Sequence, residues 1–407
     1  MREAMTGSTG PRPLDGVRVL ELAQIMAGPT TGMMLADLGA DVIKVEKIPG
    51  GDDSRLYREP RVGGVSAPFM MLNRNKRGIA IDLKNPRGKA VLLRMVESAD
   101  VLTENYRRGT LEKLGLGYDV LSRINPGLIY CAVSGYGRSG PMADRGGFDL
   151  IAQGFTGLMS ITGEPGRAPV KPGNSVADIN AGILAALGVL AAYVQKLKTG
   201  RGQVVETSLM AAALQQTYWH AAIFFATGVS PGPLGSSHVL AAPYQAFRTA
   251  DGYVNIGGAN QSNWERIADV LGHPEWKTDP RFADNADRMR NLAALVAEME
   301  AVLATRPSRS WIEAFDAAGV PAGPVHSIGE ALSHPQVSAR DMVVELDHPQ
   351  AGHTRALGFP ISLSDTPARV TRPAPTLGQH TREILAETGY TDAEIDSLIA
   401  EGVVRIE

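Results

Sequence analysis

One carboxylate in the sequence stands where it could act as a nucleophile. Asp178 lies in the segment Gly173-Asn-Ser-Val-Ala-Asp-Ile-Asn-Ala-Gly182, directly before an apolar stretch that predicts a helix. An aspartate at a helix start commonly caps the first turn, because its carboxylate accepts hydrogen bonds from free backbone amides. It can also form a covalent acyl intermediate where water is excluded and amides stabilise the oxyanion. The spacing alone leaves both roles open.

Cationic residues gather at three predicted connections between strands and helices. They are Lys47, the run Asn75-Lys76-Arg77, and the run Asn105-Tyr106-Arg107-Arg108. Taken singly, each is more simply a solvated surface charge. Loops at one edge of a parallel sheet converge, however, so the repetition favours a pocket for phosphate groups.

Several common chemistries lack their sequence signatures. The first predicted strand runs into Ala23-Gln-Ile-Met-Ala-Gly-Pro29 in place of a Gly-x-Gly-x-x-Gly turn, which argues against a nicotinamide-dinucleotide enzyme. No histidine pair has metal-ligand spacing, so no metal site is predicted. A Gly-x-Ser-x-Gly elbow is also missing, which argues against a serine hydrolase.

Composition indicates a globular protein of two domains. The chain has 407 residues, 44% of them hydrophobic, and a formal net charge of -3, so no global field favours nucleic acid or an anionic membrane. The single cysteine, Cys131, lies in an apolar run and is expected in the core. The N-terminus does not resemble a signal peptide, and the apolar stretch Ala181–Val194 is short for a bilayer. We expect a cytoplasmic protein.

The first half of the chain alternates between strand and helix patterns. This alternation predicts an α/β fold with a parallel sheet covered by helices on both faces and ligands at the carboxyl ends of the strands. The expected strands are 17–22, 41–46, 78–83, 101–104, 128–133 and 204–206. The expected helices are 28–38, 88–96, 118–124, 178–197 and 208–227.

The second half has a different character, which predicts a smaller α+β domain. A hairpin is expected at 244–256 and helices at 261–271, 291–304 and 308–318. Strands from about Gly329 onward and short helices at 381–388 and 392–401 are expected to complete the first domain. The predicted organisation is a flexible tail at 1–13, a large domain at 14–228, a linker at 229–240, a small domain at 241–328 and a C-terminal part of the large domain at 329–407.

Short motifs along nearly the whole chain resemble those of the class III CoA-transferases, also called the CaiB/BaiF or formyl-CoA transferase family, which includes α-methylacyl-CoA racemases. Early motifs are Leu14-Asp-Gly-Val-Arg-Val-Leu-Glu-Leu22, Ala27-Gly-Pro29, Leu38-Gly-Ala-Asp-Val-Ile-Lys-Val-Glu-Lys47 and Asn75-Lys-Arg77. Later motifs are Ala99-Asp-Val-Leu-Thr-Glu-Asn-Tyr106, Ser134-Gly-Tyr-Gly137, Gly200-Arg-Gly-Gln203, Ala318-Gly-Val-Pro321, His334-Pro-Gln-Val337 and Leu377-Gly-Gln-His380. Their number and order make the resemblance specific.

The resemblance implies a Rossmann-like large domain built from both chain ends, a smaller middle domain and an interlocked homodimer. It implies ping-pong transfer of coenzyme A from an acyl-CoA donor to a small carboxylic acid, with no tightly bound cofactor. Asp178 then serves as the nucleophile, forming a mixed anhydride and afterwards an aspartyl-CoA thioester. The CoA contacts that carry over by motif are Ile25, Met26, Ala27, Lys47, Asn75, Lys76, Asn105, Tyr106 and Lys113.

Three departures from the family patterns bear on function. Met26 replaces a glutamine that some members carry, and Gly257-Gly-Ala-Asn-Gln261 replaces a glycine run that closes the site in the formyl-CoA enzyme. The racemases have Gly-His-Asp where this chain has Gly147-Phe148-Asp149. Phenylalanine cannot exchange a proton, which argues against a racemase.

Two alternatives to a transferase stay open, namely an acyl-CoA racemase and a catalytically silent CoA-binding subunit. The sequence does not identify the donor or the acceptor. Tyr218, Trp219 and His220 are candidates for lining an acyl pocket, and equally for packing a helix.

Overall fold

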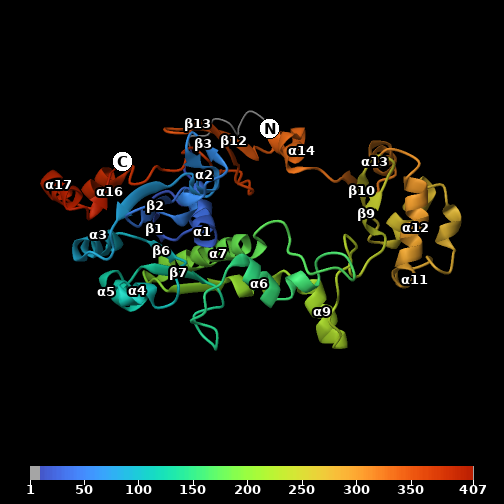
Figure 1. Cartoon of the computed structure of the whole chain (residues 1–407), viewed down its shortest axis with the longest axis horizontal. Coiled ribbons are helices and arrows are strands. Elements are labelled where there is room, and N and C mark those ends of the chain that lie inside the picture. Colours follow the sequence, from blue (N-terminus) through green and yellow to red (C-terminus); the bar gives the residue numbers. More distant parts are fainter. Residues whose placement is uncertain (1–9, 407) are drawn as a thin grey trace. The chain divides into compact units, whose positions relative to one another are not determined.

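The computed structural model describes residues 10–406, which form two compact units (Figure 1). The first unit contains the described residues up to Thr156, then Gly173–Gln216 and the chain from Pro335 onward. The second contains Gly157–Pro172 and Thr217–His334. Most of the tail predicted at 1–13 lies outside the described residues.

A seven-stranded sheet forms the centre of the first unit. Its order is β14-β5-β2-β1-β6-β7-β8, and every neighbouring pair is parallel except β14 with β5. The strands are β1 (Arg18–Leu22), β2 (Asp41–Glu46), β5 (Arg77–Ile81), β6 (Val101–Glu104), β7 (Ile129–Ser134), β8 (Val204–Ser208) and β14 (Val404–Arg405). The predicted α/β class with a parallel sheet is confirmed.

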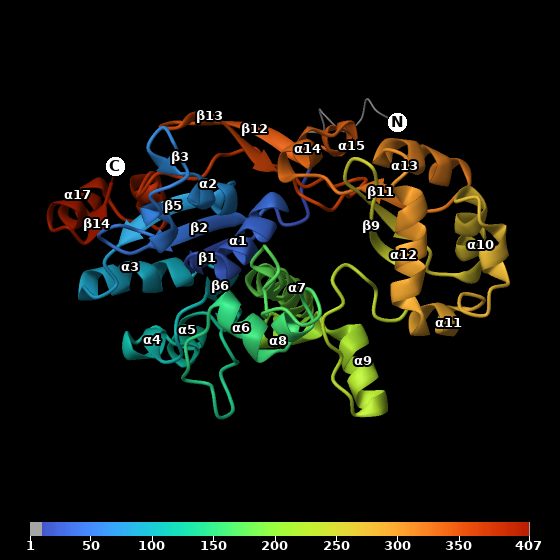
Figure 2. The same ribbon diagram turned by 45° about the vertical axis from the view of Figure 1, so that its right-hand side comes forward.

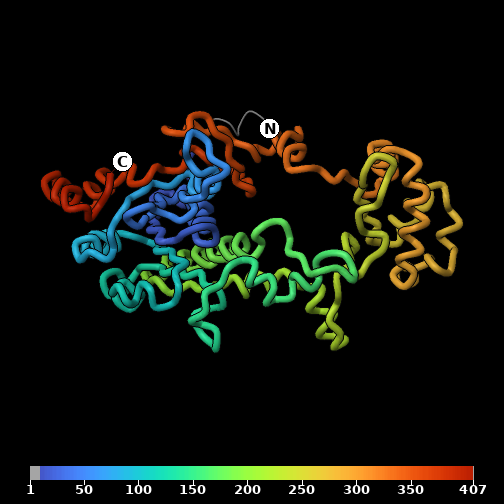
Figure 3. The backbone as a smooth tube through the Cα atoms, in the orientation of Figure 1, coloured from blue at the N-terminus to red at the C-terminus, as the bar shows by residue number. Residues whose placement is uncertain are grey.

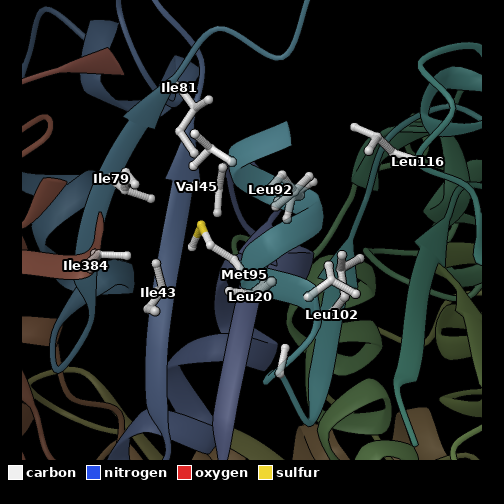
Figure 4. Close-up of a cluster of buried hydrophobic side chains, with 14 of the residues drawn as sticks. Leu20, Ile43, Val45, Ile79, Ile81, Leu92, Met95, Leu102, Leu116 and Ile384 are labelled. Atoms are coloured by element: carbon white, nitrogen blue, oxygen red, sulfur yellow. The ribbon is translucent and has the colours of Figure 1, made fainter. Parts of the chain in front are cut away.

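Helices pack on both faces of this sheet because successive strand residues point to opposite sides. Leu20 and Leu22 of β1 belong to a buried cluster on one face. Figure 4 shows Leu20 in this cluster with Leu92 and Met95 of α3 (Pro86–Val96). Glu21, between those leucines, points to the other face, where a side chain on Gly32 of α1 (Ala27–Asp37) would collide with it. The remaining helices of this sheet region are α2 (Ala67–Asn73), α4 (Thr110–Lys113), α5 (Tyr118–Ile124), α6 (Asp149–Phe155) and α8 (Leu209–Gln215).

The long helix α7 (Val176–Thr199) lies directly against α1 (Figure 2). A side chain on Gly182 would come within 2.6 Å of the Ala27 carbonyl oxygen, so glycine is required for this approach. The Thr31 hydroxyl donates to the Gly182 carbonyl at 3.1 Å, which ties the two helices together. By length and composition alone, α7 is the one helix among the described residues that could cross a membrane.

The C-terminal segment completes the first unit. Figure 3 shows the end of the chain lying beside its N-terminal part, where β14 pairs with β5. Helices α16 (Thr381–Glu387) and α17 (Asp392–Ala400) add Ile384 and Leu398 to the cluster around α3. The hairpin of β3 (Arg61–Val62) with β4 (Val65–Ser66) was not expected from the sequence. The strands expected after about Gly329 are the hairpin of β12 (Val343–His348) with β13 (Gly352–Leu357). Helix α15 (Pro335–Ala339) precedes β12.

The second unit has a three-stranded antiparallel sheet in the order β11-β10-β9. Its elements are α9 (Tyr218–Thr227), β9 (Tyr244–Arg248), β10 (Tyr253–Gly257), α10 (Gln261–Val270), α11 (Asn285–Arg290), α12 (Leu292–Leu303), α13 (Ser308–Ala317), β11 (Ala322–Pro324) and α14 (Ile328–Ser333). Trp264, Trp276 and Trp311 are buried in its core. The segment Gly157–Pro172, expected in the large domain, belongs here because the Gly235 amide donates to the Gly163 carbonyl at 2.8 Å.

A cluster of buried charges lies beneath the loop between β1 and α1. The Lys44 ammonium is within 3.0 Å of a Glu21 carboxylate oxygen and 2.8 Å of an Asp52 oxygen, and all three side chains are fully buried. Lys76 contacts the second Glu21 oxygen at 2.8 Å. Burial would lower the pKa of Lys44, but Glu21, Asp52 and Glu46 together raise it above its ordinary value.

Replacing Lys44 with methionine would leave two buried carboxylates short of a counter-charge. We expect the free energy of unfolding to fall by about 3–5 kcal/mol, the usual effect of removing one partner of a buried pair. The exposed Lys47, three residues along, is a matched control whose change to methionine should cost less than about 0.5 kcal/mol. Urea unfolding of both variants measures the difference, and equal losses would contradict the prediction.

Candidate active site

A cavity of about 460 Å³ opens at the carboxyl ends of the parallel strands in the first unit. This edge is where ligands bind in open α/β sheets. Its walls come from the loops after β1, β2, β6 and β7 and from the starts of α7 and α8. The lining residues are Gln24, Ile25, Met26, Ala27, Asp53, Asn105, Tyr106, Arg107, Arg108, Val133, Ser134, Gly135, Ala143, Arg145, Gly146, Gly147, Phe148, Asp178 and Leu209.

Asp178 lies in the first turn of α7 and lines this cavity. The helix begins after Ser175, so Asp178 is its third residue and does not hold the capping position. Within residues 10–406, its carboxylate has no hydrogen-bond or ion-pair partner. A half-buried carboxylate with both oxygens free is suited to attack a bound electrophile.

The residue that does cap this helix is Asp149, at the start of α6. Its Oδ1 accepts a hydrogen bond from the Ala177 amide at 2.9 Å, and its Oδ2 accepts one from the Gln153 side chain at 2.6 Å. The role of Asp149 was not predicted, because a cap supplied by a residue 28 positions away leaves no local pattern. By satisfying the first turn, Asp149 leaves the Asp178 carboxylate free.

Burial raises the pKa of Asp178 to about 6, and the neighbouring charge of Asp149 adds to this shift. The carboxylate is therefore desolvated but still mostly ionised at neutral pH. Desolvation makes a carboxylate a stronger nucleophile, since less water must be removed before it reacts.

The loop after β1 is held in a strained conformation at the cavity wall. Ile25 has a φ of 66°, a left-handed value that a β-branched residue rarely adopts. Its amide donates to Asp52 at 3.1 Å. The Gln24 backbone exchanges two hydrogen bonds with the Asn105 side chain, at 2.9 and 2.8 Å. These contacts bring Ile25, Met26 and Ala27 to the same cavity as Asn105 and Tyr106, all five of which were predicted CoA contacts.

The other four predicted CoA contacts do not line the cavity. Lys47 is exposed and hydrogen-bonds to two lining residues, Gln24 and Asp53. Lys113 is exposed on α4. The Asn75 side chain donates to Asp37 and to the Arg369 carbonyl, so it anchors the C-terminal segment.

The Lys76 ammonium is fully buried among oxygen atoms, at 2.9 Å from the Pro29 carbonyl and 3.0 Å from Asn73 Oδ1. Burial lowers its pKa to about 8, and the charge of Lys44 lowers it further, although Glu21 opposes both. The second predicted cation run is thus internal. Arg77, its third member, is paired with Asp41, Glu383 and Glu387.

The cations that do reach the cavity are arginines. Arg108 pairs with Asp144 at 3.5 Å. The guanidinium groups of Arg107 and Arg145 have no partner among residues 10–406, and that of Arg107 lies against Gly146. Arg145 was not singled out in the sequence, because it stands in a loop with no motif of its own.

Two glycine segments form the wall around these arginines. Gly135 and Gly147 pass so close that a side chain on either would come within 2.8 Å of the other's backbone. The next residue, Phe148, lines the cavity with 75% of its surface exposed. No histidine lines this cavity among the described residues, so it offers no imidazole base.

The candidate acyl-pocket residues Tyr218, Trp219 and His220 belong to the second unit. Tyr218 and Trp219 are exposed on α9, which has no buried residue. Among the described residues, no group of three His, Cys, Asp or Glu side chains is placed to hold a metal ion.

Comparisons with known proteins agree on one family. A sequence model described as CoA-transferase family III matches residues 14–381. A succinyl-CoA:glutarate CoA-transferase of Mus musculus is 37% identical over 97% of this chain and 91% of its own. A succinate–glutarate CoA-transferase of Agrobacterium fabrum is 40% identical over 92% and 95%. The crystal structure of a CAIB/BAIF family protein from Brucella suis superposes with a TM-score of 0.83 at 38% identity, covering 93% and 100%.

The chain therefore belongs to CoA-transferase family III. The resemblance seen in the motifs is confirmed, and so is the predicted enzyme class, a CoA-transferase.

The raised pKa of Asp178 predicts an acid limit on activity. Because a group whose pKa is about 6 is ionised above that value, kcat/KM for an acyl-CoA donor should fall about tenfold per unit below pH 6. Asp149→Asn removes the neighbouring charge, so the midpoint should move to lower pH. Asparagine retains an oxygen for the Ala177 amide, and the unpartnered Gln153 Oε1 can accept from its amide group after rotation.

The control is Asp144→Asn, the same charge change at an exposed position in the same loop. It should leave the midpoint in place. An Asp149→Asn profile that coincides with the wild-type profile would contradict the assignment of the acid limb to Asp178.

Proposed function

We propose that this protein transfers coenzyme A from an acyl-CoA donor to a carboxylic acid through covalent intermediates on Asp178. The observation that carries the proposal is the free, desolvated Asp178 carboxylate in the cavity at the carboxyl edge of the sheet. A capping aspartate would be engaged by the backbone, whereas here Asp149 provides the cap.

The chemistry proceeds in two mirrored halves. An Asp178 oxygen attacks the thioester carbonyl, the carbon–sulfur bond breaks, and a mixed anhydride and CoA thiolate result. The thiolate attacks the aspartyl carbonyl and displaces the donor acid, which leaves an aspartyl-CoA thioester. The acceptor carboxylate then attacks this thioester to form a second anhydride, and the thiolate takes the acceptor acyl group, which frees Asp178.

The cavity contains groups suited to CoA. The loop residues Ile25, Met26 and Ala27 and the pair Asn105 and Tyr106 supply a mixed apolar and polar wall. The unpaired guanidinium groups of Arg107 and Arg145 can bind phosphate oxygens. We assign Lys76 and Asn75 a structural role instead, since their polar atoms are engaged within the protein.

The names of the relatives indicate which acids to test first. Two of them act on glutarate and succinyl groups, which are dicarboxylic. The second carboxylate of such an acid needs a cation in the site. The cavity has three lining arginines, Arg107, Arg108 and Arg145, so one of them can bind this carboxylate while the others bind phosphate. Small dicarboxylates are therefore the proposed acceptor class.

The covalent route can be tested by trapping. Incubation with succinyl-CoA and hydroxylamine should convert Asp178 to a hydroxamate, because hydroxylamine attacks both the anhydride and the aspartyl thioester. Peptide mass spectrometry locates the product. Asp178→Asn should lose the adduct and at least about 10³-fold in kcat while keeping CoA affinity.

Asp149→Asn is the matched variant, since it removes the adjacent carboxylate and should retain the adduct. If no hydroxamate forms on Asp178 with any acyl-CoA donor while CoA binds, the covalent role is wrong. Deuterium exchange at the substrate α-carbon under those conditions would support the racemase alternative.

We further propose that the protein is a homodimer, as the family resemblance implied. An apolar stripe on α7 supports this proposal, since Ile183, Leu187, Val194 and Leu197 recur at helical spacing and are exposed. Exposed apolar area of this kind marks an interface.

Light scattering should therefore give about twice the chain mass of 43.2 kDa. Leu187→Glu should weaken the dimer, because it places a charge in the proposed interface. Gln195→Glu, at an exposed polar position of the same helix, should not. A wild-type mass of one chain would refute the proposal.

A further inference from the structure

A second buried carboxylate, Glu104, lies next to the cavity and takes no part in the proposed chemistry. It is the last residue of β6 and is 2% exposed. The three residues that follow it, Asn105, Tyr106 and Arg107, all line the cavity. Burial of a carboxylate is costly unless its oxygens have hydrogen-bond partners, so the partners of Glu104 indicate its role in the structure.

Both oxygens of Glu104 are engaged, and by two different loops. Oε2 accepts a hydrogen bond from the Tyr106 backbone amide at 2.7 Å. Oε1 accepts from the Arg138 guanidinium at 2.6 Å and from the Tyr130 hydroxyl at 3.3 Å. One carboxylate thus joins the loop after β6 to the loop after β7.

Arg138 extends this connection to two more elements. Its second guanidinium nitrogen donates to Glu112 of α4, and its backbone amide donates to Glu206 of β8. Arg138 is therefore the residue at which the carboxyl ends of β6, β7 and β8 are linked. Neither Arg138 nor Glu104 lines the cavity.

We infer that Arg138 and Glu104 are positioning residues that hold the segment Asn105–Arg107 in its CoA-binding conformation. Glu104 fixes the Tyr106 amide by a hydrogen bond, and Arg138 holds the carboxylate in the orientation that accepts it and favours its ionised form. The hydrogen bond between the Tyr106 amide and Glu104 lies one residue from Asn105, whose side chain holds the loop after β1. It also lies one residue from Arg107, whose guanidinium reaches the cavity. This inference rests on the proposed use of the cavity for CoA.

The inference predicts that CoA affinity depends on pH through the titration of Glu104. Burial raises the pKa of Glu104 to about 7, and Arg138 and the hydrogen bonds from Tyr106 and Tyr130 oppose the shift. Besides these groups, Glu112 and Cys131 face the same carboxylate, and Glu112 raises its pKa further. Protonation below pH 7 weakens the bond to Arg138, so CoA affinity should fall as the pH is lowered from 8 to 6.

The test is calorimetric titration of the full-length protein with free CoA at several pH values. Arg138→Gln and Glu104→Gln should each raise the dissociation constant at pH 8 by about tenfold or more. In Glu104→Gln the fall in CoA affinity near pH 7 should vanish, because glutamine does not titrate there. In Arg138→Gln the midpoint of that fall should move to higher pH, since the cation that favours the ionised form of Glu104 is gone.

Two further variants separate positioning from general damage. Arg138→Lys keeps the charge beside Glu104 and should restore much of the affinity. Arg87→Gln removes an exposed arginine of α3 that pairs with Glu401, and should leave both affinity and pH dependence unchanged. Melting temperatures show that each variant is folded.

The outcomes distinguish this inference from the proposed function. Unchanged CoA affinity in folded Arg138→Gln and Glu104→Gln would overturn the positioning role, as would a fall in affinity centred near pH 7 that persists in Glu104→Gln. Failure of the wild-type protein to bind CoA would overturn the proposed function together with this inference. Loss of the Asp178 hydroxamate with intact CoA binding would leave the positioning role standing.

Discussion

The geometry of the site depends on the buried contact between Lys44 and the carboxylates of Glu21 and Asp52. Glu21 and Lys44 project from adjacent parallel strands toward the α1 face, so their pairing is set by the sheet register. Asp52 joins them and presents its other oxygen to the amide of Ile25. The left-handed conformation of that β-branched residue costs energy and persists only because its surroundings hold it. The buried pair of Lys44 and Asp52 thus fixes the loop after β1, in a region where water cannot compete for the same hydrogen bonds.

A contact from outside the segment also explains why the Asp178 carboxylate has no partner and is free to face the cavity. A helix start needs acceptors for its free amides, and a local aspartate normally provides one. Here Asp149 reaches across from α6 to the Ala177 amide, while Ser175 makes no side-chain cap. The carboxylate proposed as the nucleophile is thereby left without a capping role. Burial raises its pKa, and the charge of Asp149, the residue that provides the cap, adds to the shift.

The sequence predicted the elements whose signals are local. The bounds of β2, β6 and α5 agree with the expected ranges at both ends, because each is a short apolar or amphipathic segment between clear turns. Strands were expected after about Gly329, but the bounds of β12 and β13 were not predicted, since these exposed strands alternate without a strong apolar face. The expected helix 208–227 is two helices, with Gln216 ending the first. For the site, Asp178 and the five lining residues were predicted from motifs. Asp149 acts through a contact with a residue 28 positions away, and Arg145 reaches the cavity from a loop with no motif, so no spacing in the sequence indicates either.

The predicted phosphate pocket shows where sequence reasoning reaches its physical limit. The sequence places cations at three predicted connections and does not distinguish them. In the structure the second run directly precedes β5, whose first residue is Arg77. Lys76 is engaged by the buried Glu21 and Arg77 by three partly exposed carboxylates, whereas Arg107 has no carboxylate partner among the described residues. A cation engaged by buried carboxylates has no charge to offer a ligand. A cation that could bind a ligand here must both line the cavity and lack a partner within the described residues, as Arg107 and Arg145 do, and both conditions are properties of the fold and not of the residue.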